Sequence, residues 1–216
     1  MPTTPEEKLA GWVSISEVLG YFQEPTLVDW KVRTGAKEAK RISTVATKIG
    51  TRVHELIEQE FLGKPVKFSS KDPEDVKNCI EGYNKWKEDF GFVIEDMEQQ
   101  VVDNDALVVG HYDIFGEKTL VDIKTSSRVN LKMWLQVNKY AQMRGGCDYV
   151  AILRLDKNLG IYQFEKRAVD QKCVELFDSL LKLYRYFNDP MGQGASHVTS
   201  QSSTTQPAGR STESLD

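Results

Sequence analysis

The sequence has few cysteines, and they are not paired. Cys79, Cys147 and Cys173 stand far apart among 216 residues and form no C-x-x-C pair. Structural zinc sites and iron–sulfur clusters usually take cysteine ligands at such short spacings. A disulfide-stabilised domain needs a denser, even-numbered set. The sequence therefore predicts no iron–sulfur cluster, no cysteine-bound zinc and no disulfide framework.

Long hydrophobic runs are also missing. No apolar stretch approaches the roughly 20 residues that a transmembrane helix requires, although hydrophobic residues make up 40% of the chain. The first residues, MPTTPEEKLAGW, contain no basic segment followed by an apolar one, which is the pattern of a secretory signal. We therefore expect an intracellular protein with no membrane partner.

Large apolar side chains are nearly absent from residues 191–216, which are rich in Gly, Ser, Thr and Gln. Such a segment cannot bury enough surface to offset the entropy lost on ordering. We expect one folded domain over residues 1–190 and a disordered tail over residues 191–216.

A net positive charge, which phosphate binding favours, is missing as well: the formal charge is −4. The charge is unevenly distributed, however. The segment 31–52 carries seven basic residues and one acidic residue, giving +6 locally and leaving −10 for the rest. This segment is either a solvated helix face or a phosphate-binding surface, and composition alone does not decide between them.

The spacing of apolar residues predicts a chain of alternating helices and strands. Apolar residues at intervals of three and four favour a helix, and runs rich in Val, Ile and aromatic residues favour strands. Helices are predicted at 14–21, 25–34, 36–62, 73–90, 131–144 and 170–187, and strands at 92–102, 106–115, 118–125, 148–155 and 160–165. This order predicts an α/β fold with a central mixed β-sheet flanked by helices and an N-terminal helical segment.

Two carboxylates and a lysine come together in the predicted hairpin 106–125. Asp122 and Lys124 are two residues apart and share a strand face, and Asp113 lies on the preceding strand. A two-residue loop at Gly116-Glu117 would place Asp113 diagonal to Asp122, about 7 to 8 Å away, whereas a four-residue loop would place it directly opposite, about 5 Å away. Either loop puts all three side chains on one face.

Two carboxylates at that range repel each other and are costly to desolvate unless a divalent cation lies between them. A metal site is one interpretation of the hairpin. The alternative is a surface ion pair between Asp122 and Lys124, with Asp113 an ordinary polar residue of the strand.

Two further pairs have the i, i+4 spacing that places side chains on one helix face. His54 and Glu58 lie on the predicted helix 36–62, and Gln136 and Tyr140 lie on the helix that follows the D-x-K strand. Taken alone, His54 suits a hydrogen-bonded core histidine and Tyr140 suits the core. His54 could instead be a ligand, and the amide of Gln136 and the hydroxyl of Tyr140 are equally able to orient a phosphate or Lys124.

Together these residues resemble the PD-(D/E)XK nuclease superfamily, and within it the RecB-like exonuclease branch of phage and recombination nucleases. Four motifs stand in the order of that branch, and Glu98 is similar to an additional acidic position in it. They are Gly50-x-x-x-His54-x-x-x-Glu58, Gly110-x-x-Asp113, Asp122-Ile123-Lys124 and Gln136-x-x-x-Tyr140. The chain lacks the four iron–sulfur cysteines of many members.

The resemblance implies a restriction-endonuclease-like core and a Mg²⁺- or Mn²⁺-dependent deoxyribonuclease, most simply an exonuclease that processes DNA ends in recombination, repair or phage DNA metabolism. It implies metal ligands at His54, Asp113, Asp122 and the Ile123 carbonyl, with Glu58 and Glu98 as further acidic groups. Catalytic roles fall on Asp113, Asp122, Lys124, Gln136 and Tyr140.

The resemblance also implies a surface and a setting. DNA, single-stranded or with double-stranded ends, would be bound by Lys37, Lys40, Arg41, Lys48, Arg52 and Arg128. A recombination or replication protein is an expected partner, and the cytoplasm of a bacterium or phage-infected cell an expected location. Two alternatives stay open: a nuclease fold that binds nucleic acid or protein without cleaving, and a site-specific restriction-type endonuclease.

Overall fold

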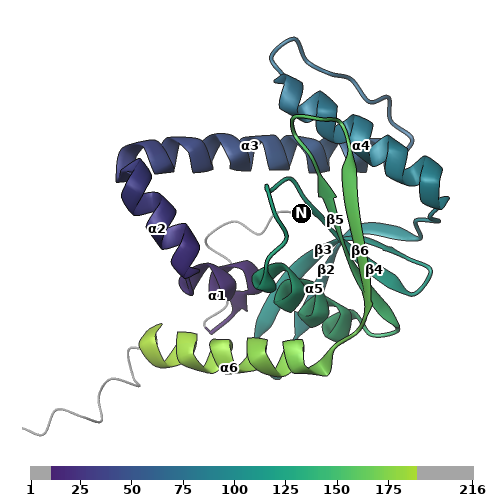
Figure 1. Ribbon diagram of the computed structural model, residues 1–216. Coiled ribbons are helices and arrows are strands. Elements are labelled where there is room, and N and C mark those ends of the chain that lie inside the picture. The colour runs from purple at the N-terminus through teal and green to yellow at the C-terminus, as the bar shows by residue number, and fades with distance from the viewer. Residues whose placement is uncertain (1–10, 189–216) are drawn as a thin grey trace, which may run out of the picture.

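A six-stranded mixed sheet with helices on both faces lies at the centre of the computed structural model, which describes residues 11–188 (Figure 1). The elements are β1 (Val13–Ser14), α1 (Ile15–Tyr21), α2 (Pro25–Thr34), α3 (Ala36–Phe61), α4 (Glu74–Phe90), β2 (Asp96–Asp103), β3 (Val108–Gly116), β4 (Thr119–Lys124), α5 (Leu131–Arg144), β5 (Tyr149–Leu155), β6 (Tyr162–Ala168) and α6 (Gln171–Asn188). The predicted tail, 191–216, lies outside the described residues. The predicted α/β class with a helix-flanked mixed sheet is confirmed.

Local signals in the sequence explain where several helices begin and end. The hydroxyl of Ser14 accepts the Glu17 N–H at 3.1 Å and caps α1, and the side chain of Asn130 accepts the Met133 N–H and caps α5. Gly91 ends α4 in the left-handed conformation, with φ of 56°.

The sheet opens beside the middle of β3. The strand order is β1-β3-β4-β5-β6, with β2 also paired to β3. Residues 108 and 109 of β3 pair with both β1 and β2, so β1 must lie on the edge of β3 that faces β4. On that edge β4 pairs only with residues 114–116. Residues 110–113 therefore face an interruption of the sheet between β1 and β4.

The β3–β4 turn lies one residue later than predicted. Gly116 stays in the ladder opposite Thr119, and the turn residues are Glu117 and Lys118, with φ values of 49° and 54°. Gly116 is needed there because a Cβ atom would lie 2.0 Å from the Val93 carbonyl oxygen. Extending this register places Asp113 opposite Asp122, the closer of the two arrangements that the sequence allowed.

The regular pleat of β3 is interrupted at Asp113. Tyr112 and Ile114 are two residues apart and should share a face, yet they pack in different hydrophobic cores. The interruption extends to β2, where Glu98 lies between the partners of Ile114 and Tyr112, forms no registered pair and has φ of 51°. A left-handed conformation is uncommon for a residue other than glycine and often marks a functional site.

The two cores lie on opposite sides of the sheet. One core joins the sheet to α1, α5 and α6 and includes Val18, Leu135 and Phe177. The other joins it to α3 and α4 and includes Leu56 and Trp86. Within the described residues, every helix is too short or too polar to cross a membrane.

Helix α2 and the first half of α3 extend away from both cores (Figure 1). No residue of α2 is buried, and Ala39 is the only buried residue of α3 before Ile49. Ile42 and Val45 belong to the apolar stripe of the sequence but are 38% and 46% exposed. We call α2 and residues 36–48 of α3 the helical arm.

Candidate metal-dependent active site

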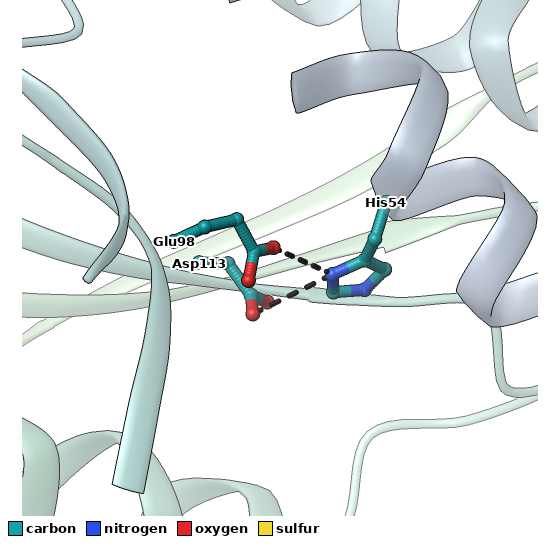
Figure 2. A group of neighbouring side chains, drawn as sticks. All are labelled: His54, Glu98 and Asp113. Atoms are coloured by element: carbon teal, nitrogen blue, oxygen red, sulfur yellow. Dashed lines mark hydrogen bonds and ion pairs between the residues drawn. The ribbon is translucent and has the colours of Figure 1, made fainter. Parts of the chain in front are cut away.

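His54, Glu98 and Asp113 form a compact cluster beside the interruption in the sheet (Figure 2). His54 projects from α3, and its Nδ1 lies 3.2 Å from Glu98 Oε1 and 3.5 Å from Asp113 Oδ1. One ligand atom from each residue lies within 4.8 Å of the others, so the three could hold a metal ion. Glu98 reaches the cluster from the left-handed position in β2.

The second carboxylate of the hairpin, Asp122, lies next to this cluster and pairs with Lys124. Lys124 Nζ donates to Asp122 Oδ1 at 2.8 Å, and Asp113 Oδ2 accepts the backbone N–H of Ile123 at 2.5 Å. Asp113 therefore reaches β4 through its side chain where the backbone ladder has ended. The structure thus brings together His54, Asp113, Asp122 and the Ile123 backbone, together with Glu98, the additional acidic residue named from the sequence.

One oxygen of Asp122 supports the assignment of a cation site. Asp122 is 1% exposed, and its Oδ2 has no hydrogen-bond partner in the described residues. Lys124 Nζ lies 2.7 Å from this oxygen and forms an ion pair with it. Buried polar atoms are nearly always satisfied. Carboxylate oxygens and one imidazole form a donor set that suits Mg²⁺ or Mn²⁺.

Burial and opposite charges shift the titration of these groups. Burial alone would lower the pKa of His54, but the charge of Asp113 and the hydrogen bond to Glu98 outweigh it and raise the pKa to about 9. Burial raises the pKa of Asp122 above its ordinary range, against the effect of Lys124. Burial also works to lower the pKa of Lys124, but Asp122 and Asp113 raise it, so the side chain remains an ammonium group.

Gln136 and Tyr140 approach the acidic groups from α5. Gln136 Nε2 donates to the Tyr140 hydroxyl at 2.8 Å, and burial raises the pKa of Tyr140 to about 12, so the phenol stays protonated. A Cβ atom at Gly110 would lie 2.4 Å from Tyr140 Cε1. The glycine of the second motif thus lets the tyrosine of the fourth lie against β3.

A cleft of about 880 Å³ leads to these residues. Its walls come from α3, the end of β4, α1, α5 and the β5–β6 turn. It adjoins a hollow of about 430 Å³ that reaches Asp113, Asp122 and Tyr140, and His54, Glu98 and Lys124 line both. Glu58 lines the cleft on the same helix face as His54. A Cβ atom at Gly50 would meet only the Thr125 hydroxyl, at an ordinary contact distance of 3.5 Å.

The predicted DNA-binding residues fall into two groups. Lys37, Lys40, Arg41 and Lys48 are exposed on α3, and Arg128 is exposed after β4, where it donates to Thr26 of α2. Arg52 differs, because its guanidinium binds Asp72 at 3.1 Å and the Lys67 carbonyl at 3.0 Å. Arg52 thus anchors the α3–α4 connection.

Several residues that line the cleft were not predicted from the sequence, among them Ser16 and Lys157. Neither belongs to a motif. Ser16 lies in the first turn of α1, and Lys157 lies in a turn, so no periodic pattern distinguished them.

The chain matches no protein-family model and no curated protein. Among solved structures, an alkaline exonuclease from Laribacter hongkongensis aligns over 81% of this chain and 86% of its own, with 12% identity and a TM-score of 0.47. A phage-related exonuclease from Haemophilus somnus 129PT aligns over 61% of this chain and 77% of its own, with 11% identity and a TM-score of 0.37. Likenesses this distant establish no family for the chain, and its function has to be argued from the site.

Proposed function

We propose that this chain is a metal-dependent deoxyribonuclease of the PD-(D/E)XK superfamily, of the RecB-like type, that hydrolyses phosphodiester bonds at DNA ends. One observation carries the proposal. Asp113 and Asp122 face each other where β3 and β4 separate, and they lie beside Lys124 and the His54–Glu98 pair at the end of a cleft.

His54, Glu98, Asp113 and Asp122 would hold Mg²⁺ or Mn²⁺ through their side chains, with the Ile123 carbonyl as a further oxygen ligand. A bound divalent ion lowers the pKa of a coordinated water and neutralises charge on phosphoryl oxygens. In the overall reaction, water adds to phosphorus, one ester P–O bond breaks, and a proton passes to the leaving oxygen.

The chain's own residues would position the reactants. Lys124, held by Asp122, would donate hydrogen bonds to the attacking water or to a phosphoryl oxygen. Gln136 keeps one amide hydrogen and its carbonyl oxygen available beyond its bond to Tyr140, so the pair can orient a phosphate. Burial of Asp122 and Tyr140 excludes water from the inner side of the site.

The test incubates the purified full chain with end-labelled linear DNA and closed circular DNA, single- and double-stranded, in Mg²⁺, Mn²⁺ or EDTA. We expect nucleotides to be released from linear DNA in either metal and not in EDTA, with circular DNA left intact. Asp122→Asn should abolish release. Asp148→Asn is the matched control, because Asp148 forms an exposed ion pair with Lys118 away from the cleft.

Each outcome decides a different part of the proposal. Cleavage of closed circular DNA would refute the proposed restriction to DNA ends, but the chain would still be a metal-dependent nuclease. If no substrate is cleaved in a metal-dependent manner, the proposal that the chain is an enzyme is refuted. The alternative that the sequence also allowed, a nuclease fold that binds without cleaving, would then be favoured.

A further inference from the structure

The turn between β5 and β6 brings a lysine into the cleft. Lys157 lines the same cleft as His54 and Lys124 and is partly buried. Its ammonium group forms no hydrogen bond or ion pair with any residue from 11 to 188. Lys124, by contrast, is committed to Asp122 at 2.7 Å. Lys157 is thus an available cation on the cleft wall.

The backbone that carries Lys157 is held firmly against α4. Asn78 Nδ2 donates to the Lys157 carbonyl at 2.8 Å, and Asp156 Oδ1 accepts the N–H groups of Asn158 and Leu159 at 2.9 and 3.1 Å. Gly82 lets α4 approach this turn, because a Cβ atom there would lie 2.7 Å from the Ile161 carbonyl oxygen.

A side chain presented from such a fixed turn loses less entropy on binding a ligand than one on a mobile loop. The firm attachment therefore suits a binding residue better than a lysine that merely solvates the surface.

The surroundings of Lys157 favour an anionic, hydrogen-bonding ligand. The cleft carries the hydroxyl groups of Thr47, Thr51, Thr125 and Ser126, and its carboxylates, Glu55, Glu58 and Glu98, lie on α3 and β2 rather than on the turn of Lys157. Arg154 pairs with Lys124 in the β4–β5 register, and Lys157 lies three residues beyond Arg154, in the turn after β5 ends at Leu155. Lys157 and Lys124 therefore enter the cleft from different segments of the chain.

We propose that Lys157 binds a backbone phosphate of the substrate strand, on a nucleotide next to the one that is cleaved, without reading a base. The inference rests on the proposed nuclease function and deepens it, because it makes the enzyme sensitive to substrate length. A strand long enough to reach Lys157 gains a contact that the shortest substrates lack.

The experiment compares wild type, Lys157→Ala and Lys157→Arg, with Lys182→Ala on the remote helix α6 as the matched control. Binding of a labelled single-stranded oligonucleotide is measured in EDTA against salt concentration, and cleavage of a long oligonucleotide and of a dinucleotide is measured in Mg²⁺. Loss of one charge-assisted hydrogen bond should raise Kd and KM roughly tenfold for the long substrate, with kcat nearly unchanged. The slope of log Kd against log salt should fall by about 0.7.

The dinucleotide should be cleaved equally by wild type and Lys157→Ala, and Lys157→Arg should restore binding. An unchanged Kd, KM and salt slope in Lys157→Ala would overturn the Lys157 inference even if the wild type cleaves DNA. A wild type that binds without cleaving would overturn the proposed function, while the salt slope would still decide the role of Lys157. A wild type that neither binds nor cleaves would overturn both.

Discussion

Asp113 joins β3 to β4 through its side chain: its Oδ2 accepts the Ile123 N–H at 2.5 Å, just beyond the last backbone pair of the ladder. Its Oδ1 faces His54 Nδ1 at 3.5 Å. One carboxylate therefore has two separate tasks, since one oxygen satisfies a buried N–H group and the other belongs to the proposed metal site.

Substitutions at Asp113 should separate these tasks. Asp113→Ala leaves the buried N–H of Ile123 without a partner, which should cost about 1–3 kcal/mol of unfolding free energy. Asp113→Asn keeps an acceptor and should cost less. Both should abolish Mn²⁺ binding by calorimetry and all cleavage. Urea unfolding in EDTA gives the stabilities. Equal stability losses in the two variants would show that the Ile123 contact contributes nothing.

Lys124 should affect turnover more than binding. Lys124→Ala removes the ammonium group that the mechanism places beside the reacting phosphate, so kcat should fall by about 10² to 10³-fold. The Kd for DNA in EDTA should change little, because Lys124 is already neutralised by Asp122. Lys118→Ala, which breaks only the exposed pair with Asp148, is the control. A Kd that rises as steeply as kcat falls would contradict this assignment.

Much of the architecture could be predicted because its signals are local. The helix predicted at 131–144 is Leu131–Arg144, since Asn130 caps its start and Gly145 follows its end. The residues of a single motif could be placed on one face for a similar reason: D-x-K and Q-x-x-x-Y each lie within one element, and their spacing fixes which face they share.

The rest depends on contacts between distant segments. The break in the pleat at Glu98 and the two-residue strand β1 arise from pairing with β3 and have no periodic signal. In the sequence Arg52 belongs to a basic segment that suits DNA binding. In the structure its guanidinium binds Asp72, which lies 20 residues away and could not be identified as its partner from local spacing. Lys157 enters the cleft only because a turn is held against α4.

The contact between Gly110 and Tyr140 should be sensitive to one added methyl group. Gly110→Ala places a Cβ atom 2.4 Å from Tyr140 Cε1, so the ring must move, at a cost of about 1–3 kcal/mol and with reduced cleavage. In a Tyr140→Ala background, the added methyl group should cost clearly less. A double-mutant cycle by urea unfolding measures this coupling. Strictly additive effects would show that the ring is not the obstacle.

A buried ion pair far from the cleft should make stability depend on pH. Lys139 is 1% exposed and binds Asp103 at 3.2 Å and Asp178 at 3.0 Å. Burial works to raise the pKa of Asp103, but hydrogen bonds from the Ala106 N–H and Lys139 hold it below its usual value. The ionised Asp103 carboxylate therefore contributes fully to the free energy of unfolding above its unfolded-state pKa, about 3.9. This contribution is lost as the pH falls through the lower pKa that Asp103 has in the folded state.

Asp103→Asn should lower the unfolding free energy at pH 7 by about 1.5–3 kcal/mol, the range for a hydrogen bond to a charged group. The difference from wild type should shrink below pH 4. Urea unfolding at a series of pH values measures it, and a difference that stays constant down to pH 2.5 would contradict the role of the Asp103 charge.

The helical arm should contribute affinity without contributing chemistry. Lys40 lies 14 residues before His54 on one helix, roughly 21 Å at 1.5 Å per residue, so a strand bound there is several nucleotides from the metal site. Reversing Lys37, Lys40 and Arg41 to Glu should weaken DNA binding at low salt by at least tenfold and flatten its salt dependence, with kcat unchanged at saturation.

Arg52 provides the contrast to that triple variant. Because its guanidinium is committed to Asp72, Arg52→Ala should lower the melting temperature more than it lowers DNA affinity. Fluorescence anisotropy against salt and thermal unfolding distinguish the two effects. If the triple reversal left affinity and its salt dependence unchanged, DNA would have to approach the site by a route that avoids the helical arm.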